Sequence, residues 1–256
     1  MLWNRILLRR HPVFNFSRRN FFAAAAGLLV VPVAAQEKGT YRSVDPIQVP
    51  FDKPDTVTMH FGYYPVRIVE VDIPGRGKQP VWYMLFEVWN KTGTPQQIVP
   101  EFTIVSKDLA MPGSWTDEPL PSVVKQIIEI EDKQKNRNIQ TTASITAKKI
   151  PITKPDSFPN TVTGIAVWSS VPAKAATLNK FSIYVTGLSI GLIESDAGEG
   201  SKVIRRKTIQ LDFVKPTDNK NVKMDDIKID DNNGLGGEKW YYRAATYKKA
   251  DAPAKP

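Results

Sequence analysis

The chain has 256 residues, of which 41% are hydrophobic and 24% charged; its net charge is +9 and it contains no cysteine. This length suits one large domain or two small ones, and the composition is that of a globular protein rather than a fibrous or disordered one. The absence of cysteine excludes disulfides, thiolate metal sites, cysteine nucleophiles and a lipid-bearing N-terminal cysteine. Because the chain has only 2 histidines, most metal and acid–base constellations are excluded as well.

The first 35 residues have the order of a secretory signal peptide. Residues 1–20 carry arginines and no acid, residues 21–31 are an unbroken apolar run, and Val33-Ala34-Ala35 suits a cleavage point after Ala35. The apolar run is shorter than the roughly 20 residues that a membrane-spanning helix needs. We therefore predict that residues 1–35 are a signal peptide.

Within this leader, Ser17-Arg18-Arg19-Asn20-Phe21-Phe22 resembles the twin-arginine export motif, with Arg18 and Arg19 as its central pair. The motif's usual leucine and lysine are replaced by Phe22 and Ala23. The resemblance implies export of the folded protein to the periplasm or the exterior. A general secretory signal that contains two arginines is the alternative. The remaining chain is similar to uncharacterised exported bacterial proteins and to no family of known activity.

Cleavage of the leader would change the charge of the protein. The leader holds five of the 35 basic residues and none of the 26 acidic ones, so residues 36–256 carry 30 basic and 26 acidic residues, a net charge of +4. Such a small excess is no electrostatic footprint for DNA or RNA. We therefore predict no nucleic-acid partner, and contact with a membrane only during export.

Apolar alternation with a period of two recurs along the remaining chain, as is typical of strands with one buried face. Residues 81–89 are apolar on both faces, so we expect a central strand there, in an antiparallel meander with 66–73 and 97–106. The other expected strands are 56–61, 138–150, 161–168, 180–187, 202–214, 222–229 and 239–244.

Together these strands predict an all-β fold, a mainly antiparallel sandwich, immunoglobulin-like or jelly-roll-like, of about eight to ten strands. We assign residues 36–247 to this single domain and expect the polar tail, residues 248–256, to be disordered.

One short crossover helix is expected in the middle of the chain. Ser122 follows Pro119-Leu120-Pro121 and is a suitable N-cap. Four apolar residues then share one face at helical spacing: Val123, Val124, Ile127 and Ile128.

Two serine motifs match enzyme signatures in their letters only. Residues 187–191 read Gly-x-Ser-x-Gly, the nucleophile elbow, but no helix pattern follows them and no histidine lies beyond His60, which we expect to face water. Ser122-Val123-Val124-Lys125 and Lys91-Thr92-Gly93 match elements of penicillin-recognising serine enzymes, in reversed order. We interpret these motifs as a strand bulge, a helix start and a hairpin turn.

A pair of glutamates offers the alternative of glycoside hydrolysis. Glu87 interrupts the apolar run 81–89, and Glu70 lies on the strand expected to precede it. If the two strands pair, Glu70 and Glu87 are candidates for the two carboxylates of a glycosidase. An ion pair of Glu87 with Arg67 or another basic residue is the structural explanation.

An acidic stretch near the C-terminus offers the alternative of a cation site. Asp230, Asp231 and Asn232, with Glu238 as a further ligand, supply oxygens, but the spacing does not match a calcium-binding loop. We expect a solvated acidic turn, no bound metal and no cofactor.

Aromatic residues are the remaining candidates for binding. Trp115 is expected in a loop, and Trp240-Tyr241-Tyr242 lies on the last strand. Exposed aromatic side chains can pack on sugars or anchor a protein partner. We therefore predict an exported, soluble cell-envelope protein with a binding or structural role and no catalytic activity, whose partner is an envelope protein or a polysaccharide. A carbohydrate-binding module that uses these aromatics is the sharper form of this prediction.

Overall fold

The structure is a computed structural model, and it describes residues 41–171, 178–196, 202–215, 227–231 and 237–244, without the side chain of residue 196. The predicted signal peptide, the predicted tail and most of the expected strand 222–229 lie outside these residues. All the described residues belong to one compact unit, Glu37–Pro256.

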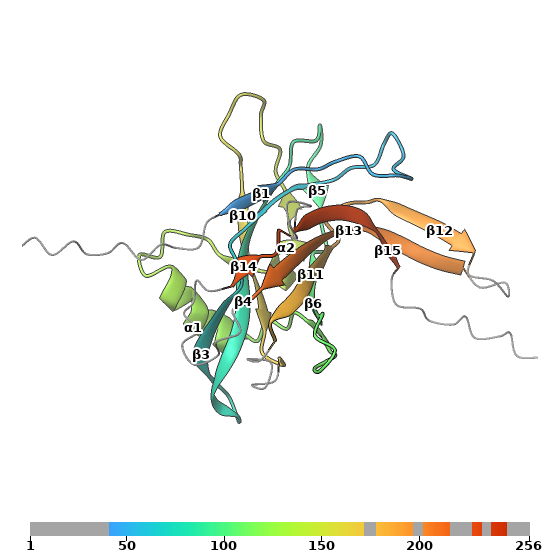
Figure 1. Cartoon of the computed structure of the whole chain (residues 1–256). Helices are drawn as coiled ribbons and strands as arrows, with labels where there is room; N and C mark the ends of the chain where they lie inside the picture. The colour runs from blue at the N-terminus through green and yellow to red at the C-terminus, as the bar shows by residue number, and fades with distance from the viewer. Residues whose placement is uncertain (1–40, 172–177, 197–201, 216–226, 232–236, 245–256) are drawn as a thin grey trace, which may run out of the picture. The chain divides into compact units, whose positions relative to one another are not determined.

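The described residues form two sheets that pack face to face (Figure 1), which confirms the all-β sandwich. The first sheet contains β1 (Arg42–Val44), β2 (His60–Tyr63), β3 (Arg67–Ile73), β4 (Gly77–Trp89), β8 (Gln140–Thr141) and β10 (Val162–Trp168). The second contains β6 (Glu101–Ser106), β7 (Ser114–Thr116), β11 (Lys180–Thr186), β12 (Leu192–Asp196), β13 (Lys202–Val214), β14 (Lys228–Ile229) and β15 (Glu238–Ala244). A small ladder joins β5 (Gln96–Gln97) to β9 (Lys149–Ile150).

The long strand β4 is the centre of the first sheet, as its two apolar faces predict. It pairs with β10 along one edge, and with β2 and then β3 along the other, all antiparallel. The β3–β4 hairpin turns at residues 74–76; Gly75 in the turn and Gly77, the first residue of β4, have φ of 77° and 70°. Glycine adopts such positive φ angles at little cost, so the strand begins four residues earlier than expected.

The two faces of β4 belong to two different apolar cores. Trp82, Met84, Phe86 and Val88 face the second sheet, where the ring centroids of Phe86 and Phe102 are 4.6 Å apart. Val81, Tyr83 and Leu85 point to the other side, toward a smaller core. The six-stranded sheet is therefore covered on both sides.

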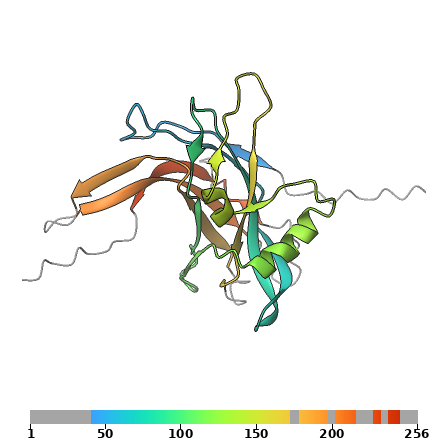
Figure 2. The same ribbon diagram turned by 180° about the vertical axis from the view of Figure 1, so that it is seen from behind.

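Helix α1 (Pro121–Glu131) covers this outer side, against β3 and β4 (Figure 2). Val123 and Ile127 are fully buried against the sheet, as the helical spacing predicts. The predicted N-cap was wrong: Leu120 occupies the N-cap position without a side-chain hydrogen bond, and Pro121 begins the helix. Proline suits the first helical turn because the N–H it lacks has no partner within the helix.

Two expected strands differ in their place or type, and the strand expected at 56–61 begins only at His60, as β2. The strand expected at 97–106 crosses to the second sheet as β6 and leaves the meander, so only the β3–β4 hairpin of that meander forms. Residues 138–150 fold into β8, a second short helix α2 (Thr142–Thr146) and β9. The Thr141 hydroxyl accepts a hydrogen bond from the Ser144 N–H, a local cap that competes with strand pairing.

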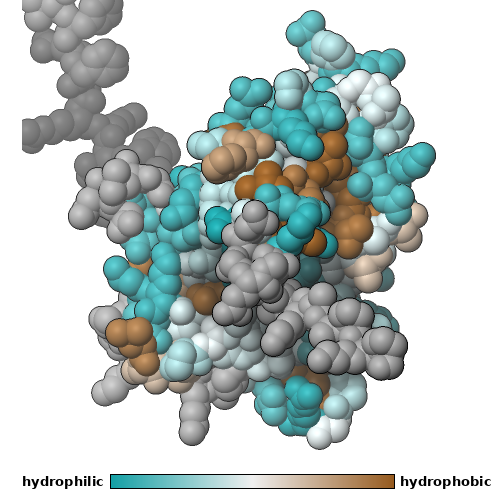
Figure 3. Space-filling view, turned by 90° about the vertical axis from the view of Figure 1, so that its right-hand side faces the viewer, coloured by the Kyte–Doolittle hydropathy of each residue, from teal (hydrophilic) through white to brown (hydrophobic). Residues whose placement is uncertain are grey.

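The second sheet extends beyond the core as an arm made by β12 and the first half of β13. Large apolar side chains on it are exposed: Leu192 by 47% and Ile204 by 42%, with Ile190 just before the arm at 60%. Figure 3 views this side of the molecule and shows apolar side chains among polar ones. Further along β13, Ile209, Leu211 and Phe213 belong to the core between the two sheets.

Candidate functional site

The outer face of the second sheet brings tyrosine and basic side chains together. Side chains alternate along a strand, so Ile209 and Leu211 of β13 point into the core while the residues between them point outward. Pairing then places Tyr184 of β11 and Tyr241 and Arg243 of β15 on the outer face. The Arg243 guanidinium carbon lies 3.9 Å from the Tyr184 ring centroid. Within the described residues, both helices pack against the first sheet.

Tyr241 is fixed by its surroundings. Burial, and after it the neighbouring Tyr184 hydroxyl, raises the pKa of Tyr241 above its ordinary value. Lys239 Nζ lies 5.8 Å from the Tyr241 ring centroid, a cation–π contact on the same face. Such a contact is worth about 0.5–1 kcal/mol at an exposed site. Two partly buried rings with two cations beside them therefore form an ordered patch, which we call the tyrosine face (Tyr184, Lys239, Tyr241 and Arg243).

A buried carboxylate borders the tyrosine face. Asp212 Oδ1 accepts hydrogen bonds from Ser182 Oγ and Gln210 Nε2, each at 2.7 Å, and forms an ion pair with Lys107 Nζ at 2.8 Å. Burial alone would raise the pKa of Asp212, but these donors outweigh it and lower the pKa below its ordinary value. Asp212 is therefore charged at neutral pH, and it orients the polar groups next to Tyr184.

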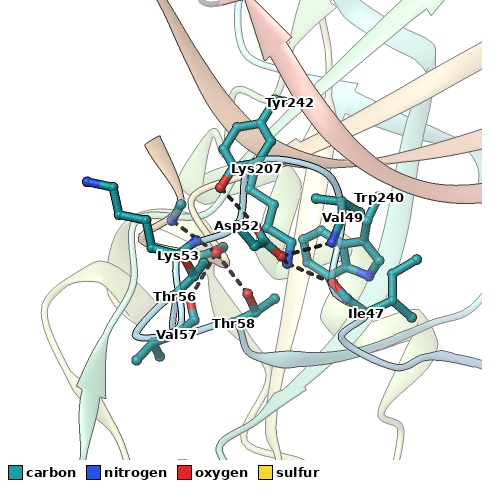
Figure 4. A network of polar contacts seen from close by, with 12 residues as sticks. Ile47, Val49, Asp52, Lys53, Thr56, Val57, Thr58, Lys207, Trp240 and Tyr242 are labelled. Carbon is teal, nitrogen blue, oxygen red and sulfur yellow. Dashed lines mark hydrogen bonds and ion pairs between the residues drawn. The ribbon is translucent and has the colours of Figure 1, made fainter. Parts of the chain in front are cut away.

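The inner face of β13 carries a second polar cluster, drawn in Figure 4. Lys207 Nζ lies 2.5 Å from Asp52 Oδ2 and donates to the Ile47 carbonyl at 2.8 Å. Asp52 also accepts from the Tyr242 hydroxyl at 2.8 Å and from the Val49 N–H at 3.0 Å. Each of these Asp52 contacts is a donor, so the cluster anchors the loop before β2.

A polar cavity of about 410 Å³ adjoins this cluster and includes His60. The expectation that His60 faces water was wrong: its side chain is only 17% exposed and its ring is stacked on Trp89, with centroids 5.4 Å apart. Its Nδ1 lies 3.0 Å from Asp45 Oδ1. Burial, opposed by Asp45, lowers the pKa of His60 below its ordinary value.

The predicted pair of glutamates does not form. Glu70 is opposite Pro80 in the β3–β4 ladder, whereas Glu87 is seven residues further along β4, opposite Gly62. At about 3.3 Å per residue the two positions are about 23 Å apart, far beyond the roughly 5–10 Å of glycosidase carboxylates. Arg67 does not pair with Glu87 either, because it contacts Glu131. The Tyr41 hydroxyl donates to Glu87 at 3.2 Å.

The predicted aromatic residues do not share one surface. Trp240 is 5% exposed and faces the core, and Tyr242 also points inward, to Asp52. Trp115 lies in β7 rather than in a loop and packs against the core from the sheet edge. Only Tyr241 of these four lies on the outer face, because consecutive side chains of a strand point to opposite sides.

The predicted acidic ligands have other contacts. Glu238 accepts hydrogen bonds from Tyr63 and from Arg42 Nε, the latter at 2.6 Å. Asp230 lies 3.6 Å from Lys180 Nζ, Asp231 is exposed, and Asn232 lies outside the described residues. In the described part of the chain no cluster of three or more histidine or acidic side chains is placed to hold a metal ion.

The Gly-x-Ser-x-Gly motif is structural. Ser189 bridges to Thr58, and its hydroxyl donates to the Val57 carbonyl at 2.8 Å. Strand β12 follows it, where a nucleophile elbow requires a helix. Gly187 has a φ of 77°, and a Cβ there would lie 1.8 Å from the Val99 carbonyl oxygen.

Sequence reasoning missed Tyr184, Arg243 and the Lys207–Asp52 pair. The sequence does indicate a special role for Lys207. It is two residues before Ile209 and four before Leu211, so it lies on the same core-facing side of the strand, where a charge needs a partner. Asp52 has no such indication, since it lies in a loop 155 residues away.

Comparison of the chain with protein-family models, with curated protein sequences and with solved structures gives no match. In the described residues no helix has both the length and the apolar character needed to cross a membrane.

Proposed function

We propose that this chain is exported from the cytoplasm and acts in the cell envelope as a non-catalytic binding protein, with a polysaccharide as its partner. Export is supported by the leader, in which basic, apolar and cleavage-site residues follow in the order of a signal peptide. The polysaccharide is supported by one observation, the Arg243–Tyr184 stack beside Tyr241 on the outer sheet face.

The chemistry of the tyrosine face suits sugars. A sugar ring presents apolar C–H groups on its faces and hydroxyls at its rim, and a tyrosine offers an apolar ring with a polar tip. Arg243 and Lys239 add N–H donors, and the tyrosine hydroxyls both donate and accept. Because contacts within the sheet face already hold these side chains, little side-chain conformational freedom is lost when a ligand binds.

Binding is tested with the purified protein by affinity electrophoresis in gels that contain envelope polysaccharides and by a glycan array. We expect retardation by at least one polysaccharide, and a loss of affinity of at least tenfold in Tyr241→Ala and Tyr184→Ala. Phe158→Ala is the matched control, because Phe158 is a 98% exposed aromatic residue of a loop. It should bind like the wild type.

Two results would overturn the polysaccharide proposal. One is an empty array together with unchanged mobility in every gel. The other is a loss of binding in Leu192→Ser with none in Tyr241→Ala, which would assign the contact to the β12 arm instead.

Export is tested separately in the producing cell. An Arg18→Lys/Arg19→Lys leader should abolish export through the twin-arginine route, since that route depends on the pair. Export that continues undiminished through the general secretory pathway would contradict the twin-arginine assignment and leave the sheet-face proposal untouched.

A further inference from the structure

The groove beside α1 has an apolar floor and a basic rim. Helix α1 turns Val123 and Ile127 toward the sheet, while Val124 and Ile128, one position further on, line a cavity of about 640 Å³. Residues four apart lie on one helix face, so these two side chains form a continuous ridge. Pro119, Pro121 and Ala143 complete the apolar lining. The volume lies within the range of small-molecule sites, about 300–1,000 Å³.

Three cations stand around this floor: Lys125 on the helix, and Lys135 and Arg137 on the loop that follows it. The described residues place no carboxylate within ion-pair distance of any of the three. The acids of the lining are Glu129, which is exposed, and Asp132, which is 5% exposed. The rim is therefore positive overall.

The buried acid serves the loop and not the groove. Asp132 Oδ1 accepts the Asn136 N–H at 3.1 Å, and Oδ2 accepts the Arg137 N–H at 2.8 Å. Lys135 has a φ of 53°, and its N–H donates to the Asp132 carbonyl at 3.0 Å. These bonds fold the loop into a tight turn, which holds Lys135 and Arg137 at the rim.

From this arrangement we infer that the groove binds a single-chain carboxylate, with its apolar chain on the Val124–Ile128 ridge and its head group at Lys135 and Arg137. Charge complementarity selects the carboxylate over a neutral head group, because a guanidinium donates to both carboxylate oxygens at once. This inference is independent of the tyrosine face, which lies on the other sheet.

The test compares decanoate with 1-decanol, which share a chain and differ in the head group, by isothermal titration calorimetry with the full-length protein. We expect decanoate to bind at least tenfold more tightly than decanol. In Lys135→Gln/Arg137→Gln that preference should fall by at least tenfold while decanol affinity is unchanged. Ile128→Gln should weaken both ligands alike.

Lys133→Gln is the control, because Lys133 is an exposed lysine of the same loop that does not line the groove. Each variant is first checked for an unchanged melting temperature. The proposal is overturned if decanol binds as tightly as decanoate, if neither binds, if Lys133→Gln loses as much preference as the double variant, or if anionic lipid vesicles bind the protein while free decanoate does not.

Discussion

Lys207 and Asp52 form an ion pair whose side chains are only 2% and 4% exposed. Lys207 stands at the end of the inward-facing row of β13, and Asp52 comes from a loop that crosses that end of the sandwich. The Lys207 ammonium also lies 5.6 Å from the Trp240 ring centroid. One contact therefore joins a loop, the core end of β13 and the last strand.

Lys207→Met is expected to destabilise the protein strongly, because it leaves the Asp52 carboxylate buried without its cation. Removing one partner of a buried pair costs about 3–5 kcal/mol. Lys202→Met on the same strand is the control: its pair with Glu194, at 3.3 Å, is exposed by 68% and 53%, and exposed pairs are worth about 0–1 kcal/mol. Urea unfolding measures both. Equal losses in the two variants would mean that burial of the Lys207 pair contributes nothing.

The same carboxylate should make stability depend on acid. Burial opposes ionisation of Asp52, but hydrogen bonds from Lys207, Val49 and Tyr242 outweigh it and hold the pKa below its ordinary value. A lowered folded-state pKa gives stability that is complete above the unfolded pKa and is lost as the pH falls through the folded one. Asp212 has the same sign.

We therefore expect the free energy of unfolding to fall with acidification below about pH 5, and less steeply in Asp52→Asn/Asp212→Asn than in the wild type. Urea unfolding at a series of pH values gives both curves. Parallel curves would show that these two carboxylates do not cause the acid sensitivity.

Docking of α1 is expected to depend on Glu131. Its carboxylate receives two hydrogen bonds from Arg67 Nη1, at 2.6 and 2.7 Å, and one from the Tyr83 hydroxyl at 2.6 Å. Glu131→Gln leaves Arg67 buried without a counter-charge, so we expect a loss of about 3–5 kcal/mol and faster hydrogen exchange of the α1 amides. Glu129→Gln, an exposed change on the same helix, should cost less than about 0.5 kcal/mol. Unchanged exchange in Glu131→Gln would contradict this role.

Alanine substitutions at Gly187 and Gly75 would distinguish the cost of backbone strain from the cost of a steric clash. Both have a φ of 77°, but a Cβ at Gly75 meets nothing within 4 Å, whereas at Gly187 it would lie 1.8 Å from the Val99 carbonyl oxygen. Gly75→Ala should therefore cost only the left-handed conformation, about 1–2 kcal/mol. Gly187→Ala should cost clearly more, measured by thermal unfolding. Equal losses would show that the Val99 segment moves aside freely.

Most long strands could be predicted, because a strand with one buried face alternates apolar and polar residues along the sequence. The strands at 162–168, 180–186 and 202–214 lie where the alternation predicts them. β5, β8 and β9 have two residues each, too few to show a period. Helix α2 forms in place of part of an expected strand, and the Thr141 side chain caps its first turn through a local hydrogen bond.

The candidate site was predicted less well. Tyr241 was named, but Trp240 and Tyr242 were grouped with it because they are its neighbours in the sequence, although adjacent residues of a strand cannot share a face. Its actual companion Tyr184 comes from β11 through the pairing of β11 with β13 and of β13 with β15. No local pattern reports such pairing, since it depends on which strands become neighbours.

The two apolar faces of β4 have a consequence for folding. In a strand with one apolar face, a slip by one residue would expose the whole hydrophobic set, and this penalty fixes the alignment. β4 lacks that safeguard, because a slip exchanges one apolar face for the other. Its alignment then depends on two other features: the turn at 74–76 at one end and the Tyr83–Glu131 hydrogen bond in the middle. If both the turn and the hydrogen bond were removed, a misaligned sheet that still buries its apolar side chains would compete with the native sheet during refolding.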